Sequence, residues 1–303
     1  MTTVGVIGLG RMGLPIAENL MERGFAVVGY RRSPAREAAE KGIVLADSPA
    51  DVAARSDVLL SIVPDIAAVR DIVEGPAGVL QGLRRGTVHI EMSTVDVTEK
   101  AQVRDRVRAA GGDLLDAPIS GSANMVRPRL ATTFASGDDA SIEAARTVLD
   151  AVSGPWVRAG AFGAGAHLKY VANLLLAVHT VAAAEALALA RRSGLDLDVV
   201  QASLDGSIAG STVWTRFGPR MRRRAYLPAP GPIATLHDIL VQIDRYRDEV
   251  GATTPMFDVA KQLFDEAVAQ GFGHLDVSFV HDQLAGGPPA DGFSENASTE
   301  GKT

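Results

Sequence analysis

A glycine-rich turn near the start of the chain constrains the fold more than any other feature. The run Gly8-Leu9-Gly10-Arg11-Met12-Gly13 follows the β-branched segment Thr3–Ile7 and precedes a segment with helical spacing of apolar residues. Gly8 permits a tight turn, Gly10 lets a pyrophosphate approach the backbone, and Gly13 allows the helix to pack closely on the strand. A strand, this loop and a helix in that order predict the first βαβ unit of a dinucleotide-binding domain.

The residues after the second predicted strand indicate which dinucleotide binds. A domain that prefers NAD places an Asp or Glu there for the ribose 2′-hydroxyl. This chain instead continues from Ala26–Tyr30 into Arg31, Arg32 and Ser33, and its next carboxylate is Glu37. Because arginine binds phosphate bidentately, we predict NADP, with NADPH preferred over NADH. If the two arginines are ordinary surface cations, the preference stays open.

The chain contains no cysteine, which removes several kinds of chemistry. Its 303 residues are 47% hydrophobic, enough for at least one sizeable core without disulfides. Thiolate catalysis and Cys-ligated metal sites are excluded, so redox chemistry has to come from an organic cofactor or from a metal held by other ligands. We expect the organic cofactor and no metal.

Charge indicates the class of partner. The formal net charge of −6 argues against a nucleic-acid binder, since such proteins usually carry a basic excess. We interpret the basic run Arg220–Arg224 as a solvated helix face or helix end. Met1-Thr2-Thr3 leads directly into an apolar run, so no targeting segment is expected and a cytoplasmic location is predicted.

The apolar stretch Tyr170–Ala190 is long enough to cross a bilayer. It contains Asn173, His179 and Glu185 and is rich in alanine, so we interpret it as a buried helix of a soluble protein with no membrane contact. The small residues of Ala182–Ala190 can pack closely against partner helices, which favours a homodimer or homotetramer.

The first half of the chain alternates short β-branched runs with amphipathic segments, a pattern typical of a doubly wound, parallel-rich sheet. Ser48-Pro49-Ala50-Asp51 is typical of a helix start, with Ser48 as cap and Pro49 in the first turn. Strands are expected at Thr3–Ile7, Ala26–Tyr30, Val58–Val63, Thr87–Glu91, Asp113–Asp116 and Ala131–Ser136.

After Gly160 strand-like runs become rare and helical periodicity dominates. We therefore predict an NADP-binding Rossmann domain over residues 1–162, a long interdomain helix over 163–194, an all-helical domain for substrate binding and oligomerisation over 195–285, and a disordered tail over 286–303. Helices are expected at Ala166–Ser193, Val199–Leu204, Val213–Arg224, Ile233–Val250 and Met256–Gln270.

Four motifs resemble those of one enzyme family. The glycine loop continues as Ala17-Glu18-Asn19-Leu20, and the others are Asp116-Ala117-Pro118-Ile119-Ser120-Gly121-Ser122, Gly163–Asn173 and Leu236-His237-Asp238-Ile239-Leu240. Together they are similar to the β-hydroxyacid dehydrogenases, which include 3-hydroxyisobutyrate dehydrogenases and tartronate semialdehyde or glyoxylate reductases and are related to 6-phosphogluconate dehydrogenase. The resemblance extends to about Leu284.

The resemblance implies roles for individual residues. Lys169 and Asn173 would be catalytic, on the family's catalytic helix. The acid group of the substrate would be held by Ser120, Gly121 and Ser122, with His237 nearby. Contacts to the cofactor, chiefly its nicotinamide ribose and ring, would come from Val63, Pro64, Ser93, Thr94 and Asp238.

Helix geometry supports the catalytic pair independently of the family. Lys169 and Asn173 are four residues apart, so they share one helix face and can reach the same small substrate. A desolvated lysine can protonate a carbonyl oxygen or act as base in the reverse direction, while Asn173 orients the substrate or stabilises the oxyanion. Taken without the resemblance, Lys169 would be an ordinary exposed lysine near a helix start.

Some positions depart from the family pattern. The first of two adjacent asparagines is Ala172, and a lysine is replaced by His237, which favours an altered substrate. Ser122 stands where a glycine is common. Arg127 and Arg129 suggest a second anionic group on the substrate, although surface arginines are the more common case.

These observations predict an NADP-dependent oxidoreductase that transfers a hydride between nicotinamide and a small β-hydroxy acid or its semialdehyde, with substrate in a cleft between the domains and Lys169 as general acid/base. Two alternatives remain. One is an imine reductase with the same fold, which the presence of Lys169 disfavours. The other is a non-catalytic, NADP-binding regulatory protein.

Overall fold

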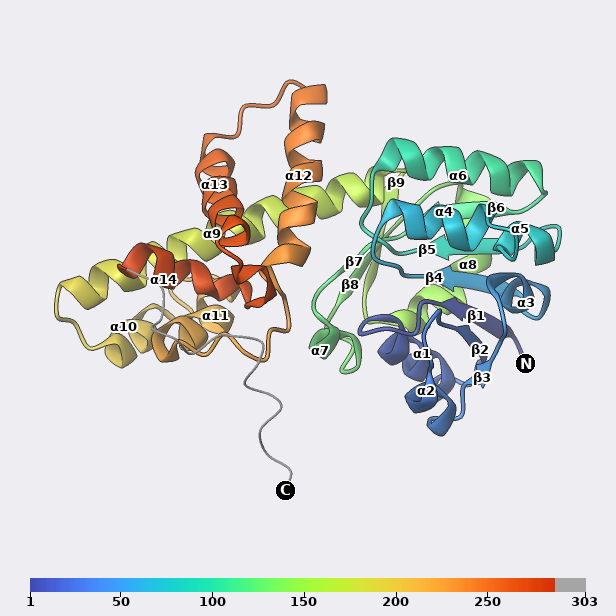
Figure 1. Ribbon diagram of the computed structural model, residues 1–303, viewed down its shortest axis with the longest axis horizontal. Helices are drawn as coiled ribbons and strands as arrows, with labels where there is room; N and C mark the ends of the chain where they lie inside the picture. Colours follow the sequence, from blue (N-terminus) through green and yellow to red (C-terminus); the bar gives the residue numbers. More distant parts are fainter. Residues whose placement is uncertain (287–303) are drawn as a thin grey trace. The chain divides into compact units, whose positions relative to one another are not determined.

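The computed structural model describes residues 1–286. The chain divides into two compact units, Met1–Ala172 and a second that begins at Asn173, and each is described by itself. The division falls within one long helix, α9 (Ala164–Arg192) (Figure 1). The predicted disordered tail lies, from residue 287 onward, outside the described residues.

The first unit is built on a nine-stranded sheet (Figure 1). Its strand order is β3-β2-β1-β4-β5-β6-β8-β7, with β9 paired to β8. The pairings from β3 to β6 are parallel, as is β8 with β9, while β8 is antiparallel to β6 and β7. The strands are β1 (Thr3–Ile7), β2 (Ala26–Tyr30), β3 (Val44–Leu45), β4 (Val58–Ser61), β5 (Val88–Glu91), β6 (Asp113–Asp116), β7 (Ile119–Ser120), β8 (Thr132–Ser136) and β9 (Trp156–Gly160).

Helices cover both faces of this sheet, and each face has its own apolar core. Alternate side chains of a strand point to opposite faces. Val58 and Leu60 therefore enter one core, while Leu59 enters the other. The first core is closed by α1 (Gly13–Glu22), α2 (Arg36–Glu40), α7 (Ala123–Val126) and α8 (Asp139–Val152). The second is closed by α3 (Pro49–Ala54), α4 (Ile66–Glu74), α5 (Val79–Gly82) and α6 (Val97–Ala109).

The carboxyl ends of the parallel strands are level with one another. Ile7 at the end of β1 pairs with Tyr30 of β2 and Ser61 of β4, and the same rung continues through Glu91 of β5 to Asp116 of β6. The loops that follow these residues therefore leave the sheet at one edge. In doubly wound folds that edge is where ligands bind.

The second unit is helical among the described residues. It contains most of α9, followed by α10 (Leu197–Leu204), α11 (Thr212–Arg223), α12 (Ile233–Glu249), α13 (Pro255–Ala269), α14 (Val280–Ala285) and two 3₁₀ turns, η1 (Phe272–His274) and η2 (Val277–Phe279). By length and composition α9 could span a membrane, a test that core helices of soluble proteins also pass, and 44% of its apolar window is buried.

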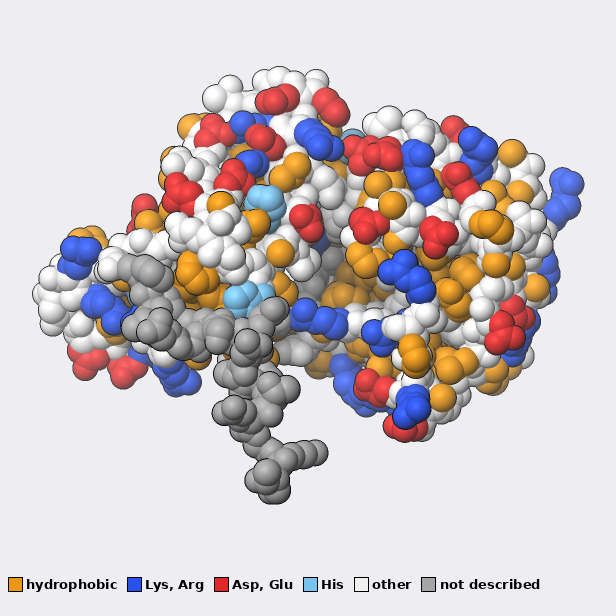
Figure 2. All heavy atoms as spheres, in the orientation of Figure 1, with side chains coloured by type: hydrophobic (Ala, Val, Ile, Leu, Met, Phe, Trp, Pro, Cys, Tyr) orange, Lys and Arg blue, Asp and Glu red, His pale blue; other side chains and the backbone are white. Residues whose placement is uncertain are grey.

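The basic run ends a helix, as expected, but it is less solvated than the sequence indicated. Arg224 caps α11 in the left-handed conformation and lies 2.9 Å from Asp282. Arg222 pairs with Asp198, and only 13% of its side chain is exposed. Acidic and basic side chains are interspersed over the face of the molecule seen in Figure 2.

The structure confirms the predicted fold class and corrects details of it. Ser48 accepts a hydrogen bond from the Asp51 amide at 3.1 Å and caps α3, as expected. Among the expected strands, Val58–Val63 is shorter than predicted and ends at Ser61. Three strands escaped the sequence pattern: the two-residue β3 and β7, and β9, whose residues are exposed or half-buried and so lack an apolar run.

Candidate active site

The glycine loop has the geometry that a pyrophosphate requires. Gly8 adopts φ +102°, and a Cβ on Gly13 would lie 1.9 Å from the Gly8 carbonyl oxygen, so neither position accepts a side chain. By contrast, the space beside Gly10 holds no described atom within 4 Å. No side chain caps the N-terminus of α1, so no side chain competes with an anion for the positive end of that helix.

A pocket of about 180 Å³ adjoins this loop. Its lining includes Leu9 from the loop, the predicted phosphate ligand Arg31, and Arg36 and Glu37 at the start of α2. Arg32 and Ser33 are exposed and do not line it. Two guanidinium groups thus stand at one small pocket next to the glycine loop, an arrangement that suits a phosphate on the adenosine ribose.

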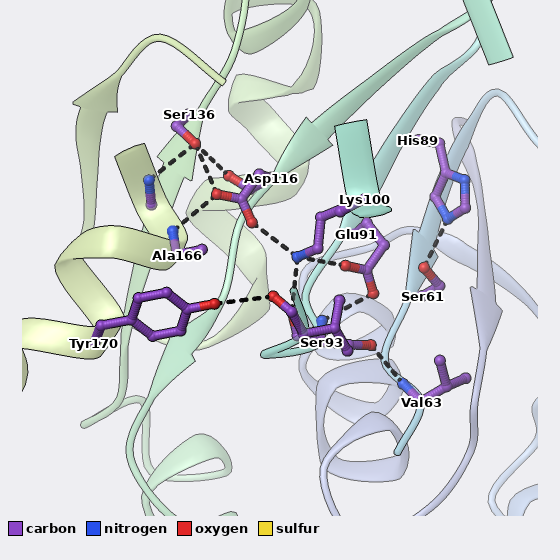
Figure 3. Close-up of polar contacts among 12 residues, drawn as sticks. Ser61, Val63, His89, Glu91, Ser93, Lys100, Asp116, Ser136, Ala166 and Tyr170 are labelled. Atoms are coloured by element: carbon purple, nitrogen blue, oxygen red, sulfur yellow. Dashed lines mark hydrogen bonds and ion pairs between the residues drawn. The ribbon is translucent and has the colours of Figure 1, made fainter. Parts of the chain in front are cut away.

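Val63 and Ser93, predicted to contact the nicotinamide end, are joined directly. The Val63 amide donates to Ser93 Oγ at 2.8 Å, and the Ser93 amide donates to Glu91 Oε1 at 2.9 Å (Figure 3). This links the loops after β4 and β5 at the carboxyl edge. Pro64 and Thr94 follow in the same two loops, exposed and half-buried respectively.

Glu91 belongs to a fully buried ion cluster. Lys100 Nζ lies 2.6 Å from Glu91 Oε2, 2.8 Å from Asp116 Oδ1 and 2.7 Å from the Ser93 carbonyl oxygen (Figure 3). Burial alone would lower the pKa of Lys100, but the attraction of the two carboxylates outweighs it and raises that pKa above its ordinary value. Lys100 therefore remains an ammonium inside the domain. The neighbouring His89 is also buried, and desolvation together with the charge of Lys100 lowers its pKa to about 4.

The same cluster holds the start of α9. Asp116 Oδ2 accepts the Ala166 amide at 2.8 Å and the Ser136 hydroxyl at 3.0 Å, so a carboxylate occupies the positive end of the helix. One turn later the Tyr170 hydroxyl donates to the Val95 carbonyl at 3.2 Å. Lys169 stands between these two anchors on the second turn of α9.

Lys169 is held in a desolvated environment. Its side chain is buried, with 8% of the residue exposed, and desolvation lowers its pKa from 10.5 to about 8. Asn173 follows one turn later on the same helix and is 4% exposed. Its Nδ2 has no hydrogen-bond partner among residues 1–286, so a buried donor is free for another group.

The loop predicted to bind the substrate's acid group is a tight turn. Ser120 ends β7 and Gly121 adopts φ +144°, where an added Cβ would lie 2.8 Å from the Ala131 Cβ. Ser122 occupies the cap position of α7, but its side chain caps nothing there. All three residues are half-buried.

Two family models cover the chain: residues 3–161 match the NAD-binding domain of 6-phosphogluconate dehydrogenase, and residues 163–283 match the NAD-binding domain of NADP-dependent 3-hydroxyisobutyrate dehydrogenase. Mouse mitochondrial 3-hydroxyisobutyrate dehydrogenase is 32% identical over 304 residues, spanning 93% of this chain and 87% of the mouse protein. The chain belongs to the β-hydroxyacid dehydrogenase family. It is thus an NAD(P)-dependent oxidoreductase.

Other members of the β-hydroxyacid dehydrogenase family agree with this assignment. Glyoxylate/succinic semialdehyde reductase 1 of Arabidopsis thaliana is 29% identical, with 91% of this chain and 96% of the plant protein covered. The structure of Mycobacterium tuberculosis 3-hydroxyisobutyrate dehydrogenase with L-serine superposes with a TM-score of 0.84 at 28% identity, over 94% of this chain and 100% of that one.

In this β-hydroxyacid dehydrogenase His237 is already engaged within its own unit. His237 Nε2 lies 3.0 Å from Asp265 Oδ1, and Asp265 in turn binds Lys261 Nζ at 2.8 Å. The adjoining Asp238 carboxylate is 80% exposed and lies 3.9 Å from His237 Nδ1. These contacts fix the imidazole on α12 against α13.

Arg127 and Arg129, which the sequence suggested as ligands of a second anionic group, both have hydrogen-bonding partners within the first unit. Arg127 pairs with Glu18 of α1 at 2.6 Å. Arg129 donates at 3.1 Å to the carbonyl oxygens of Asn19 and Ala151. These contacts give both arginines a role in fastening α7 to α1 and α8, which leaves the idea of a second anionic group without support.

Sequence reasoning missed the cluster around Lys100. Asp116 lies inside a quoted motif, yet nothing in the pattern showed that its carboxylate binds a lysine from α6 and caps α9. A lysine in a strongly charged helix normally faces water. The clue available was that two acidic residues, Glu91 and Asp116, each end an apolar strand. Among residues 1–286 no group of three or more His, Asp or Glu side chains is placed to hold a metal ion.

Proposed function

We propose that this chain catalyses the reversible, NADP-linked oxidation of a small β-hydroxy acid to its semialdehyde, with Lys169 as general acid/base. The observation that carries the proposal is the desolvated Lys169 on a helix start anchored at the carboxyl edge of the sheet. That edge also carries the glycine loop and the loops after β4 and β5.

A pKa of about 8 suits proton transfer in both directions near neutral pH. At pH 7 roughly one Lys169 side chain in ten would be neutral, against fewer than about one in a thousand for an ordinary lysine. The ammonium can protonate a carbonyl oxygen during reduction, and the neutral amine can accept the hydroxyl proton during oxidation. The nicotinamide, when bound, supplies or accepts the hydride.

Asn173 would complete the chemistry from the same helix. Its free Nδ2 donor is held one turn from Lys169, close enough for both groups to reach one substrate oxygen. A hydrogen bond from this amide would orient the hydroxyl and stabilise charge that develops on the oxygen. Because the amide is already buried, little solvent has to be displaced when that hydrogen bond forms.

The substrate class rests on the relatives and on the turn after β7. The mouse and Arabidopsis relatives are named for 3-hydroxyisobutyrate, glyoxylate and succinic semialdehyde, and the M. tuberculosis structure contains L-serine, itself a β-hydroxy acid. Ser120 and the backbone amides near Gly121 can hold the carboxylate of such a small anion. His237, bound to Asp265, would distinguish this chain's substrate from those recognised by a lysine at that position.

NADP is the cofactor that the pocket beside the glycine loop favours. Arg31 and Arg36 both line it and can form paired hydrogen bonds with a 2′-phosphate. Glu37 also lines the pocket, but Lys41 Nζ lies 3.5 Å from its carboxylate and offsets that charge.

We expect Arg31→Ala to raise KM for NADP⁺ at least about tenfold with little effect on KM for NAD⁺, since charged hydrogen bonds contribute about 1.5–3 kcal/mol. Arg55→Ala serves as the control, because Arg55 follows α3 directly and pairs with Asp51.

A screen of hydroxy acids at fixed NADP⁺ concentration tests the activity. It compares 3-hydroxyisobutyrate, glycerate, 3-hydroxypropionate, 4-hydroxybutyrate and L-serine by the rate of NADPH formation, with the matching semialdehydes tested in reverse. Turnover that depends on Lys169 supports the proposal. Faster reduction of a cyclic imine than of any semialdehyde would make the chain an imine reductase, and NADPH binding without any turnover would leave a regulatory protein.

We propose a second copy of the chain as its partner. Leu175 and Leu189 of α9 are 47% and 69% exposed, and burying such side chains against another helix is favourable. Sedimentation equilibrium of the wild type and of Leu189→Glu tests this. A monomeric wild type would refute it.

A further inference from the structure

Lys100 connects two parts of the candidate active site that are distant in sequence. Its ammonium donates hydrogen bonds to Asp116 Oδ1 at 2.8 Å and to the Ser93 carbonyl oxygen at 2.7 Å, and it forms an ion pair with Glu91 Oε2 at 2.6 Å. The side chain is fully buried. It therefore has no freedom to turn toward solvent or toward a substrate.

Through Glu91 and Ser93, Lys100 is connected to the loops after β4 and β5, which are predicted to contact the nicotinamide end of the cofactor. Glu91 accepts the Ser93 amide through its other oxygen, and Ser93 Oγ accepts the Val63 amide. Lys100 also holds Ser93 by its carbonyl oxygen. The β4 and β5 loops are thus fastened to each other and to α6.

Through Asp116, Lys100 is also connected to the start of α9. Asp116 binds Lys100 with Oδ1 and the Ala166 amide with Oδ2, while Ser136 Oγ donates to Asp116 and accepts the Gly165 amide at 3.0 Å (Figure 3). The first turn of α9 is therefore placed by a carboxylate that Lys100 itself positions. Lys169 follows three residues after Ala166.

The charges of the cluster explain why Lys100 affects both the Val63 and Ser93 loops and the start of α9. One ammonium stands between two buried carboxylates, so the trio carries a net negative charge that the positive end of α9 helps to offset. Without the ammonium, Glu91 and Asp116 would be two buried like charges with no cation between them. Any movement of these carboxylates changes the hydrogen bonds to Ser93 and Ala166 at the same time.

We propose that Lys100 is a positioning residue for hydride transfer, which sets the first turn of α9, and with it Lys169, relative to the Val63 and Ser93 loops. The proposal rests on the proposed function, because it assigns Lys100 a part in presenting Lys169 to a substrate bound over the nicotinamide. Lys100 touches neither group. It acts through Asp116 and Ser93.

The proposal is tested by the steady-state kinetics of Lys100→Met, compared with those of a control variant that loses another buried cation. Arg104→Met removes the next cation along α6, which binds Asp113 at the opposite end of β6 and whose side chain is 10% exposed. Per folded molecule, we expect kcat to fall about 100-fold in Lys100→Met, because a shift of about 1 Å in a catalytic group has this effect. KM for NADP⁺ should change less than about threefold, and Lys100→Arg should recover part of the rate. Equal kcat values in Lys100→Met and Arg104→Met would overturn the proposal.

Ser136→Ala tests the same connection if Lys100→Met does not fold. It removes the hydroxyl between Asp116 and the Gly165 amide and leaves the ion cluster in place. Ser153→Ala is its control, since Ser153 is equally buried and its hydroxyl bonds to Thr133 outside the network. A kcat several-fold lower in Ser136→Ala than in Ser153→Ala is expected, and no difference between them contradicts the positioning role.

Amide hydrogen exchange separates this inference from the proposed activity. NADP⁺ bound at the Val63 and Ser93 loops should slow exchange over residues 163–170 in the wild type, and this coupling should be lost in Lys100→Met and in Ser136→Ala. No slowing in the wild type, or its persistence in both variants, overturns the inference. If the coupling is present but no hydroxy acid is oxidised, the proposed function fails, while the coupling of α9 to the Val63 and Ser93 loops through Lys100 stands.

Discussion

Lys169 should make the folded protein less stable than a neutral residue of the same size would. Its pKa falls from 10.5 to about 8 because the surrounding protein solvates an ammonium poorly. Below pH 8 both folded and unfolded chains carry the proton, so the folded state bears the whole penalty. Each pKa unit corresponds to about 1.4 kcal/mol, which puts the penalty at about 3 kcal/mol near pH 7.

The penalty should decline as pH rises. Between pH 8 and about 10.5 the folded protein has released the Lys169 proton while the unfolded chain still holds it, so folding gains stability across this window. At pH 9.5 the remaining penalty is about 1.5 kcal/mol by the same relation. Methionine keeps the length and apolar volume of the lysine stem without the charge.

Lys169→Met is therefore expected to be more stable than the wild type at pH 7, by up to about 3 kcal/mol, and by about half of that at pH 9.5. Urea unfolding of the cofactor-free proteins at the two pH values measures the difference. The same variant should lose about 10²- to 10⁴-fold in kcat, the usual contribution of a general acid or base.

Lys261→Met provides the control for this experiment. Lys261 is a half-buried lysine of α13 that pairs with Asp265 at 2.8 Å, so its removal should cost up to about 1 kcal/mol rather than stabilise the protein. A Lys169→Met protein that is no more stable than the wild type at pH 7, or whose advantage does not shrink by pH 9.5, would refute the claim that Lys169 is held in a desolvated site.

Three further predictions concern the cofactor loop, the pH profile and the substrate. Gly10→Ala should keep the wild-type unfolding temperature but weaken NADP⁺ binding at least about tenfold. Gly13→Ala should lower the free energy of unfolding by about 1–3 kcal/mol, because its Cβ would meet the Gly8 carbonyl. Thermal unfolding measures the stability of each variant, and fluorescence titration measures its NADP⁺ binding. Reduction rates should fall as pH rises through about 8 while oxidation rates rise, because the two directions need opposite protonation states of Lys169; initial rates that change alike would count against this residue. His237→Lys should lower KM for an anionic substrate by up to about fivefold at unchanged kcat, and a raised KM would show that the imidazole itself recognises the substrate.

The glycine loop could be predicted because its requirements are steric and local. The positive φ at Gly8 and the contact between Gly13 and the Gly8 carbonyl depend only on neighbours in one βαβ unit. Strands β2 and β4 were recognisable for a similar reason, since Ala26–Val28 and Val58–Leu60 are continuous apolar runs. The strands that escaped are short or lack such a run: β7 and β9 form by pairing with β8, and β3 forms by pairing with β2.

The buried ion cluster depended on information that the sequence does not display. Lys100 enters the domain because the register sets Glu91 beside Asp116 on adjacent strands and α6 crosses above them. No local rule distinguishes it from a surface lysine. In the same way Arg31 could be proposed as a phosphate ligand from its position, while Arg36 became a candidate only when α2 brought it to the same pocket.

The unbroken course of α9 from Ala164 to Arg192 has a consequence for engineering. The spacing between Lys169 and Asn173 is set by the backbone hydrogen bonds of one helix, with a rise of about 6 Å over four residues. The turn after Ser120 and the His237 position on α12 can therefore be redesigned for other acids without touching that spacing. We therefore expect that variants changed only at the Ser120 turn and at His237 would alter substrate choice and keep the proposed acid/base pair intact.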